Sequence, residues 1–290
     1  MKTLQYGALT LRIERDADHT CRADVRARDG RVLAEADTAI AITTQYADLD
    51  GDGVPELLMA ADSGGSAGHS DSFVLTERPQ PALVAKHEGC AMTVHAASDP
   101  LNRALATCDL AFVFFESLCN ACSPRPLMFF LVRDGKLVPA HHQFVSRYDT
   151  HIQEDEQAMP PDDLQAFVAS SSADARAYVD SRARGLVLEI AADYLYSGRE
   201  QRAREALARM WPAWDRHRIF EELRSRIPQG NPPVPGAARY AGSFWRVFTM
   251  PPIRPRPMST SAPVMIHTWL TPRRFAPYAS PATTSSVPIR

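Results

Sequence analysis

Asp48-Leu-Asp-Gly-Asp-Gly-Val-Pro-Glu56 is the stretch of this sequence with the sharpest chemical meaning. The three aspartates alternate, so their side chains can turn toward one point, and the glycine after Asp52 permits a sharp turn. Four carboxylates within nine residues repel one another unless a cation lies among them. Because a ligand set made only of oxygen atoms suits Ca²⁺, we predict a Ca²⁺ site rather than a merely solvated acidic turn. The expected ligands are Asp48, Asp50, Asp52, Val54 (through its carbonyl oxygen) and Glu56.

The residues on either side of this loop favour strands rather than helices. Residues 38–46 are rich in β-branched side chains, and Ile40, Ile42 and Thr44 occupy alternate positions. Leu57-Leu-Met59 is a short apolar run of the kind found in buried strands. An EF-hand would need flanking helices and a bidentate Glu at position 12 of the loop, where this sequence has Met59. We therefore predict a strand, an acidic loop and a second strand.

This layout resembles the FG-GAP or VCBS repeats of integrin-like β-propellers, whose calcium loop has the pattern DxDxDGxxD/E. The resemblance is close over residues 48–57 and loose over residues 38–90. It implies that the carboxylate at position 9 of the loop, here Glu56, completes the calcium site. A full propeller would repeat its blades, and the sequence has no second copy of the loop. We therefore expect one antiparallel β-domain, either a degenerate propeller or sandwich-like.

Residues 1–147 have the pattern of this β-domain. Short apolar runs alternate with turn signals, and Asp-Gly pairs in Arg28–Arg31 and Arg133–Lys136 favour hairpins. The alternation slips between Ala8 and Leu9, which indicates two short strands or one strand with a bulge. Further strands are expected at Cys21–Ala27, Val32–Ala36, Ser72–Thr76, Leu83–His87, Met92–His95, Leu110–Phe115, Leu127–Val132 and Lys136–His141.

The rest of the chain changes character, which makes the expected fold class α+β. Residues 148–161 are highly charged, and we interpret them as a linker. Residues 162–228 have helical spacing and predict a small helical module, with Ser197-Gly198 ending a helix over Ala173–Tyr196. Residues 186–211 resemble one tetratricopeptide unit, although a plain helical hairpin that caps the β-domain is the simpler interpretation. Residues 229–290 are rich in Pro and Arg and contain no Asp or Glu, so we expect a disordered or loosely docked tail.

Five cysteines leave at least one thiol without an intramolecular partner. Disulfides between Cys119 and Cys122 and between Cys90 and Cys108 are one interpretation; buried thiols, or a zinc site that includes Cys119 and Cys122, are the others. Disulfides would require an oxidising compartment, and Ca²⁺ is also more abundant outside the cytosol. Both arguments favour a periplasmic or other extracytoplasmic location. The first residues lack the apolar segment of a signal peptide, so a cytoplasmic location stays an alternative.

Composition and motifs reduce the number of function classes that we expect for this chain. The 290-residue chain has a net charge of −2 and no run of 18 apolar residues, so we expect neither nucleic-acid binding nor a membrane span. Catalytic and nucleotide-binding signatures such as GxSxG, HExxH, the P-loop and GxGxxG are absent from the sequence, and we expect a protein that is not an enzyme. The small, polar stretch from Ser63 to Ser72 is either a turn or a loop that binds a protein partner. Its candidate contact residues are Ser66, His69 and Asp71.

We therefore expect a calcium-binding protein that binds another protein. Arg outnumbers Lys 29 to 3, which is typical of GC-rich, bacterial coding sequences. Bacterial proteins with a solitary calcium loop of this kind include envelope immunity proteins that inhibit lysozyme-like toxins, so the resemblance implies a secreted toxin or cell-wall hydrolase as partner. A calcium-dependent carbohydrate- or surface-binding module is the first alternative. A metal-dependent hydrolase is the second alternative.

Overall fold

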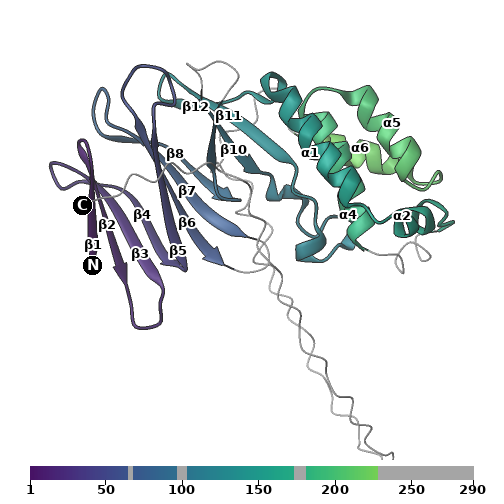
Figure 1. The fold of residues 1–290 in the computed structure, drawn as a ribbon, viewed down its shortest axis with the longest axis horizontal. Coiled ribbons are helices and arrows are strands. Elements are labelled where there is room, and N and C mark those ends of the chain that lie inside the picture. Colours follow the sequence, from purple (N-terminus) through teal and green to yellow (C-terminus); the bar gives the residue numbers. More distant parts are fainter. Residues whose placement is uncertain (65–67, 97–102, 173–180, 228–290) are drawn as a thin grey trace, which may run out of the picture. The chain divides into compact units, whose positions relative to one another are not determined.

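The computed structural model describes residues 1–64, 68–96, 103–172 and 181–227 (Figure 1). Three antiparallel four-stranded sheets are followed by a set of helices. This confirms the predicted α+β class. The expected tail over residues 229–290 lies outside the described residues, as do residues 173–180 of the helix expected over Ala173–Tyr196.

Each sheet is a meander of four strands that are consecutive in the chain, which is also the layout of a propeller blade. The first sheet contains β1 (Lys2–Tyr6), β2 (Leu9–Arg15), β3 (Cys21–Ala27) and β4 (Val32–Ala39). The second contains β5 (Ala41–Ala47), β6 (Glu56–Gly64), β7 (His69–Thr76) and β8 (Ala82–Gly89). The third contains β9 (Thr93–Ala96), β10 (Arg103–Cys108), β11 (Leu127–Arg133) and β12 (Lys136–Pro139).

The second sheet is buried on both faces. Leu57 and Met59 of β6 belong to a core shared with Leu11 and Val25 of the first sheet. Leu58, between them, belongs to the core that includes the third sheet and the helices. Because successive side chains of a strand point to opposite faces, β6 has apolar residues at every position from Leu57 to Ala61. The predicted buried strand after the acidic loop is confirmed.

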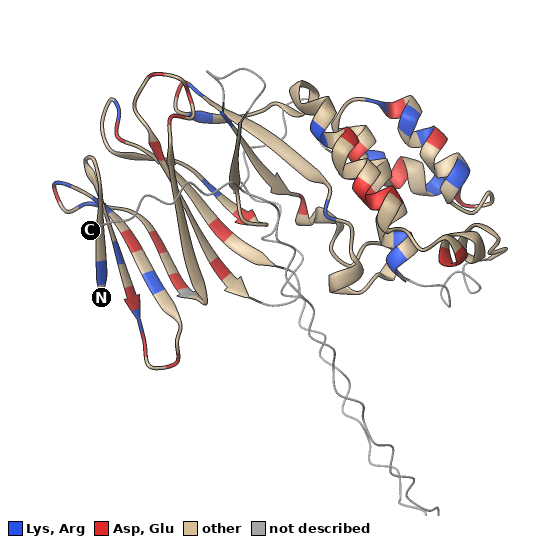
Figure 2. Cartoon of the chain, viewed as in Figure 1, with Lys and Arg blue, Asp and Glu red and all other residues tan. Residues whose placement is uncertain are grey.

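The first sheet, in contrast, has one buried face and one charged face. In β3 Cys21, Ala23 and Val25 are buried, and the residues between them are exposed or half-buried. Lys, Arg, Asp and Glu residues recur along the strands of this sheet (Figure 2). This alternation is typical of an antiparallel sheet with one solvated face. The strand predicted at Cys21–Ala27 is confirmed, β1 and β2 are the two short strands of one alternative, and β4 extends beyond the predicted Val32–Ala36 to Ala39.

Five helices of the described part follow the third sheet: α1 (Val145–Ala158), α2 (Pro161–Val168), α4 (Ser181–Tyr196), α5 (Glu200–Met210) and α6 (Arg216–Arg226). Helix α4 is central, because it contacts each of the other four and β11. Gly198 follows it with a φ of 77°, and its amide donates to the carbonyl of Leu195. This confirms the predicted helix end. Ala203 and Ala206 of α5 are fully buried, and α5 packs against α4.

Four expectations about secondary structure were wrong. Residues 148–161 are not a linker, since most of them form α1, with Tyr148 and Ile152 one turn apart on its buried side. Leu110–Phe115 is not a strand but a pair of 3₁₀ turns in which Phe112 and Phe115 pack edge to face. The strand expected through residues 38–46 breaks at Ile40, whose side chain is 52% exposed. The expected strand to His141 ends at Pro139.

The cysteines form two disulfides. Cys90 is bonded to Cys108 and Cys119 to Cys122, while Cys21 is a free, buried thiol. The pairing agrees with the disulfide interpretation and leaves no cysteine for a zinc site of the kind considered from the sequence. The Cys90–Cys108 bond joins β10 to the segment that leads out of β8.

Candidate metal centre

The acidic loop connects β5 to β6, and its backbone amides hold its own aspartates in place. Asp48 accepts hydrogen bonds from the amides of Gly51 and Gly53 at 2.8 and 3.0 Å. Asp50 accepts one from Asp52 at 3.0 Å, and Asp52 accepts one from Val54 at 2.7 Å. Both glycines have a φ of 83°, a conformation that favours glycine. The alternating sequence therefore folds into a tight turn with ordered carboxylates.

Three of the five predicted ligands converge. Asp48, Asp50 and Glu56 each place a carboxylate oxygen so that the three atoms lie within 4.8 Å of one another. Asp52 is not a member of this group; like Asp48 and Asp50, it accepts from a backbone amide, that of Val54. The structure thus brings the two ends of the nine-residue motif together, because Ala47 pairs with Glu56 at the base of the hairpin.

Glu56 is the unusual member of the group, because it is only 2% exposed to solvent. One carboxylate oxygen accepts a hydrogen bond from the amide of Leu49 at 2.7 Å. Burial, together with the charges of Asp50 and Asp52, raises the pKa of Glu56 to about 7. Within the described residues, no Lys, Arg or His forms an ion pair with the carboxylates of this loop.

This donor set fits a hard cation. All of the converging atoms are carboxylate oxygens, which are the ligands that Ca²⁺ prefers. A divalent ion would offset the negative charge that the loop concentrates beside a buried carboxylate. Asp48, Asp50 and Glu56 are the residues positioned to hold it. Asp52 lies outside the converging group, so its carboxylate would need to move toward the ion to bind it.

The stretch from Ser63 to Ser72 is a short hairpin rather than a long loop. Strand β6 ends at Gly64 and β7 begins at His69, and these two residues pair. His69 is a half-buried strand residue whose carbonyl accepts from the hydroxyl of Ser63 at 2.9 Å. Asp71 pairs with Lys86 at 3.2 Å, and Ser66 lies outside the described residues. This placement favours the interpretation of the stretch as a turn, with His69 less accessible than expected.

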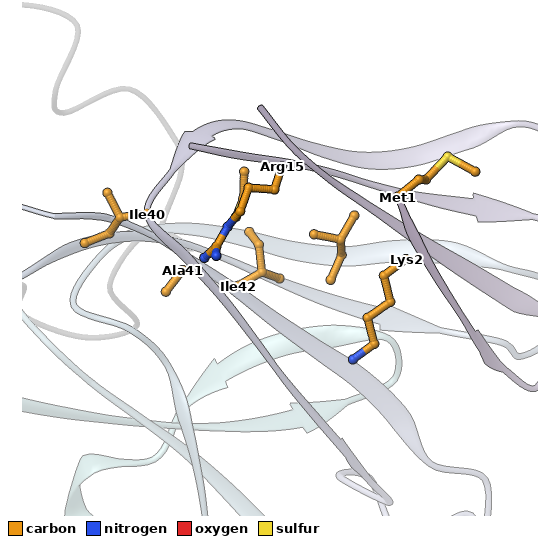
Figure 3. Close-up of a pocket in the computed structure, with 8 residues that line it drawn as sticks. Met1, Lys2, Arg15, Ile40, Ala41 and Ile42 are labelled. Atoms are coloured by element: carbon orange, nitrogen blue, oxygen red, sulfur yellow. The ribbon is translucent and has the colours of Figure 1, made fainter. Parts of the chain in front are cut away.

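An open pocket of about 410 Å³ lies at the same end of the second sheet as this hairpin (Figure 3). Ile40 and Gly64 are neighbours there, since a Cβ on Gly64 would lie 3.0 Å from Cδ1 of Ile40. The acidic loop follows the opposite end of β5, and seven strand residues span roughly 20 Å. The pocket is lined by Met1, Lys2, Ile13, Arg15, Cys21, Ile40, Ala41 and Ile42.

A second group of potential metal ligands was not predicted. His151 and Asp155 of α1 lie beside Glu189 of α4, with one ligand atom of each within 4.8 Å of the others. The sequence carries a signal for them, because His151 and Asp155 are four residues apart, as are Glu189 and Asp193. This signal gave no predicted site, because His151 and Asp155 lie in the segment interpreted as a linker.

Neither the helices nor the comparisons assign the chain to a known class. Among the described residues, no helix combines the length and apolar character that a bilayer span requires. The chain matches no protein-family model, no curated protein and no solved structure. The FG-GAP or VCBS resemblance therefore rests on the loop sequence alone and stays a hypothesis.

Proposed function

We propose that this protein binds Ca²⁺ through its β5–β6 loop and uses the β-domain that the ion stabilises to bind another protein, without catalysis. Asp48, Asp50 and buried Glu56 converge, and no Lys, Arg or His of the described residues forms an ion pair with them. This is the observation that carries the proposal. An uncompensated carboxylate is costly to bury, and a bound cation removes that cost.

The ion would act on the hydrophobic core as well as on the turn. Leu49 lies within the acidic loop, yet it is 1% exposed and packs in the large core. Its amide also donates to Glu56. Holding Glu56 in place therefore holds Leu49 in the core, which gives Ca²⁺ a stabilising role at the base of the second sheet.

The partner would bind at the other end of the second sheet. The pocket at that end of the sheet combines apolar side chains such as Ile40 and Ile42 with the cations of Lys2 and Arg15 (Figure 3). These groups suit a protein that presents an apolar side chain next to an acidic one. Because this pocket lies roughly 20 Å from the acidic loop, Ca²⁺ would not touch the partner.

The inhibitor of a secreted lysozyme-like toxin is the finer form of this proposal, and the resemblance to bacterial calcium-loop proteins is its source. The two disulfides support an oxidising, extracytoplasmic setting for it. A calcium-dependent carbohydrate module receives less support. Trp211 is fully buried, and the exposed Trp214 belongs to the helical module, whereas a calcium-dependent sugar site needs an exposed aromatic ring beside the ion.

Thermal melts with Ca²⁺ and with a chelator test the calcium site. Wild type should melt higher in Ca²⁺, because a ligand that binds only the folded state stabilises it. Asp50→Ala should lose the difference, and Asp18→Ala, which changes an exposed acid in another turn, should keep it. Equal melting temperatures of wild type with Ca²⁺ and with chelator would refute the site.

Pull-downs with Ile42→Asp and His69→Ala then test the partner surface, with Asp18→Ala as the control.

A further inference from the structure

Helices α1 and α4 each present a pair of metal-binding side chains to the other. His151 and Asp155 are four residues apart on α1, and Glu189 and Asp193 are four residues apart on α4. Residues with this spacing lie on one helix face, and the two helices pack together. Nε2 of His151 lies 3.7 Å from Oε1 of Glu189, and Nδ1 lies 3.9 Å from Oδ2 of Asp155.

Asp193 orients the imidazole. Its side chain is fully buried, and its two oxygens have separate partners: Oδ1 accepts from the amide of Leu127 at 3.0 Å, and Oδ2 lies 2.6 Å from Nδ1 of His151. A carboxylate that accepts from Nδ1 fixes the proton on that nitrogen. Nε2, on the Glu189 side, is then the nitrogen that offers a lone pair to a metal.

Three carboxylates, those of Asp155, Glu189 and Asp193, face one imidazole. Burial, with repulsion between the carboxylates, raises the pKa of Asp155 and of Glu189. Burial alone would lower the pKa of His151, but the hydrogen bond to Asp193 and the carboxylate charges together outweigh it and raise that pKa. Asp155 is 9% exposed, and its Oδ2 atom is buried without any hydrogen-bond partner. A buried carboxylate oxygen without a partner costs free energy. This orphaned atom points to a missing ligand.

We propose that His151, Asp155 and Glu189 bind a divalent transition-metal ion, with Zn²⁺ as the best fit, and that Asp193 positions His151. Tetrahedral Zn²⁺ with ligands at about 2.1 Å separates them by roughly 3.4 Å, close to the 3.7 Å between His151 and Glu189. Imidazole nitrogen beside carboxylates favours Zn²⁺ or Mn²⁺ over Ca²⁺ or Mg²⁺, which prefer oxygen ligands alone. The mostly buried site would crosslink α1 and α4.

Calorimetric titration of the full chain with Zn²⁺ tests this proposal. Metals are first removed with a chelator, and Ca²⁺ is then kept in excess so that the acidic β5–β6 loop does not take up Zn²⁺. Wild type should bind about one Zn²⁺ more tightly than any surface site does. Asp193→Asn should weaken this binding about 10–100-fold, as expected for a residue that orients a ligand, and Asp155→Asn should weaken it at least as much. Glu156→Gln, an exposed neighbour on α1, should bind as wild type does.

Glu189→Gln separates loss of the metal from loss of the fold. It removes one of three repelling negative charges, so in chelator it should melt no lower than wild type, yet Zn²⁺ should no longer raise its melting temperature. Substituting Mn²⁺ for Zn²⁺ identifies the ion, and a Mn²⁺-induced rise that Glu189→Gln abolishes supports the same site. The proposal is overturned if neither ion binds wild type, or if wild type and Glu189→Gln bind Zn²⁺ equally. In either case His151 would itself be the cation of a buried ion cluster.

Discussion

Replacing Glu56 with Gln should have opposite effects on stability in the absence and in the presence of abundant Ca²⁺. The substitution keeps an oxygen that can accept from the Leu49 amide and removes the charge. Without a cation, that charge is buried beside Asp50 and Asp52 and opposes folding. With a cation, the same charge is a ligand. A single variant therefore distinguishes a metal loop from an acidic turn that needs no ion.

The magnitude follows from the pKa of Glu56, which burial and its two acidic neighbours raise from 4.5 to about 7. At about 1.4 kcal/mol per pKa unit, the ionised carboxylate costs the folded state about 3 kcal/mol. Because the folded pKa is the higher one, the cost is absent below pH 4.5 and grows as the pH rises through 7. At pH 8 in chelator, Glu56→Gln should therefore melt about 6–12 °C above wild type.

Ca²⁺ should cancel and then reverse this advantage. A ligand at 100 times its Kd stabilises the folded state by about 2.7 kcal/mol, and at 1,000 times by about 4.1 kcal/mol. The wild-type and variant melting temperatures should thus become equal near the first concentration and cross before the second. The variant should show little response to Ca²⁺.

Thermal melts at pH 5 and pH 8, each with chelator and with a Ca²⁺ series, provide the assay. Glu35→Gln makes the same chemical change on the exposed side of the first sheet and should respond to Ca²⁺ as wild type does. The reasoning fails if Glu56→Gln melts below wild type in chelator at pH 8. It also fails if Ca²⁺ raises the melting temperatures of Glu56→Gln and wild type equally.

Three further predictions concern the scaffold. Replacing both Cys90 and Cys108 with Ser should cost about 3 kcal/mol in urea unfolding, because the bond closes a loop with a sequence separation of 18; an unchanged midpoint would contradict this. Burial lowers the pKa of His87 to about 4, so stability should fall as the pH drops from 6.5 to 4, by about 2–3 kcal/mol. His87→Gln should remove that part of the acid sensitivity. If the stability of His87→Gln and of wild type depends on pH in the same way, the prediction is refuted. Trp211→Ala should cost about 3–5 kcal/mol, since the side chain is fully buried, whereas Trp214→Ala should cost much less in the same urea series.

Sequence patterns predicted those parts of the fold whose signal is local. The Asp-Gly turn at Arg133–Lys136 and the buried run of β6 each depend on a few neighbouring residues. Strand β10 escaped prediction because nearly all of its residues are buried, so it shows no alternation, and two of its six residues are alanines, which have low β-propensity. Its pairing with β11, about 20 residues later in the chain, is what makes it a strand.

Helix α1 escaped prediction for a chemical reason. Its buried face consists of Tyr148, Ile152 and Asp155, and a pattern that counts apolar residues scores the third as polar. Asp155 is buried because His151 and the side chains of α4 surround it. Those α4 residues are about 40 positions away in the sequence. The helix and the cluster of potential ligands both depend on this tertiary contact, so neither could be predicted from neighbouring residues.

The two candidate metal sites differ in how the chain encodes them, and this explains why only one was predicted. The backbone amides of a nine-residue turn can hold its own carboxylates, as the amides of Gly51 and Gly53 hold Asp48. The loop can therefore be recognised from the sequence alone. The site at His151 exists only where α1 packs on α4, and its positioning residue, Asp193, is bound in turn to the amide of Leu127 in β11. Leu49 of the first site and Tyr148 beside the second belong to one hydrophobic core. An ion at either site would therefore stabilise packing that the other site also needs, and the β-strands and helices should depend on each other for folding.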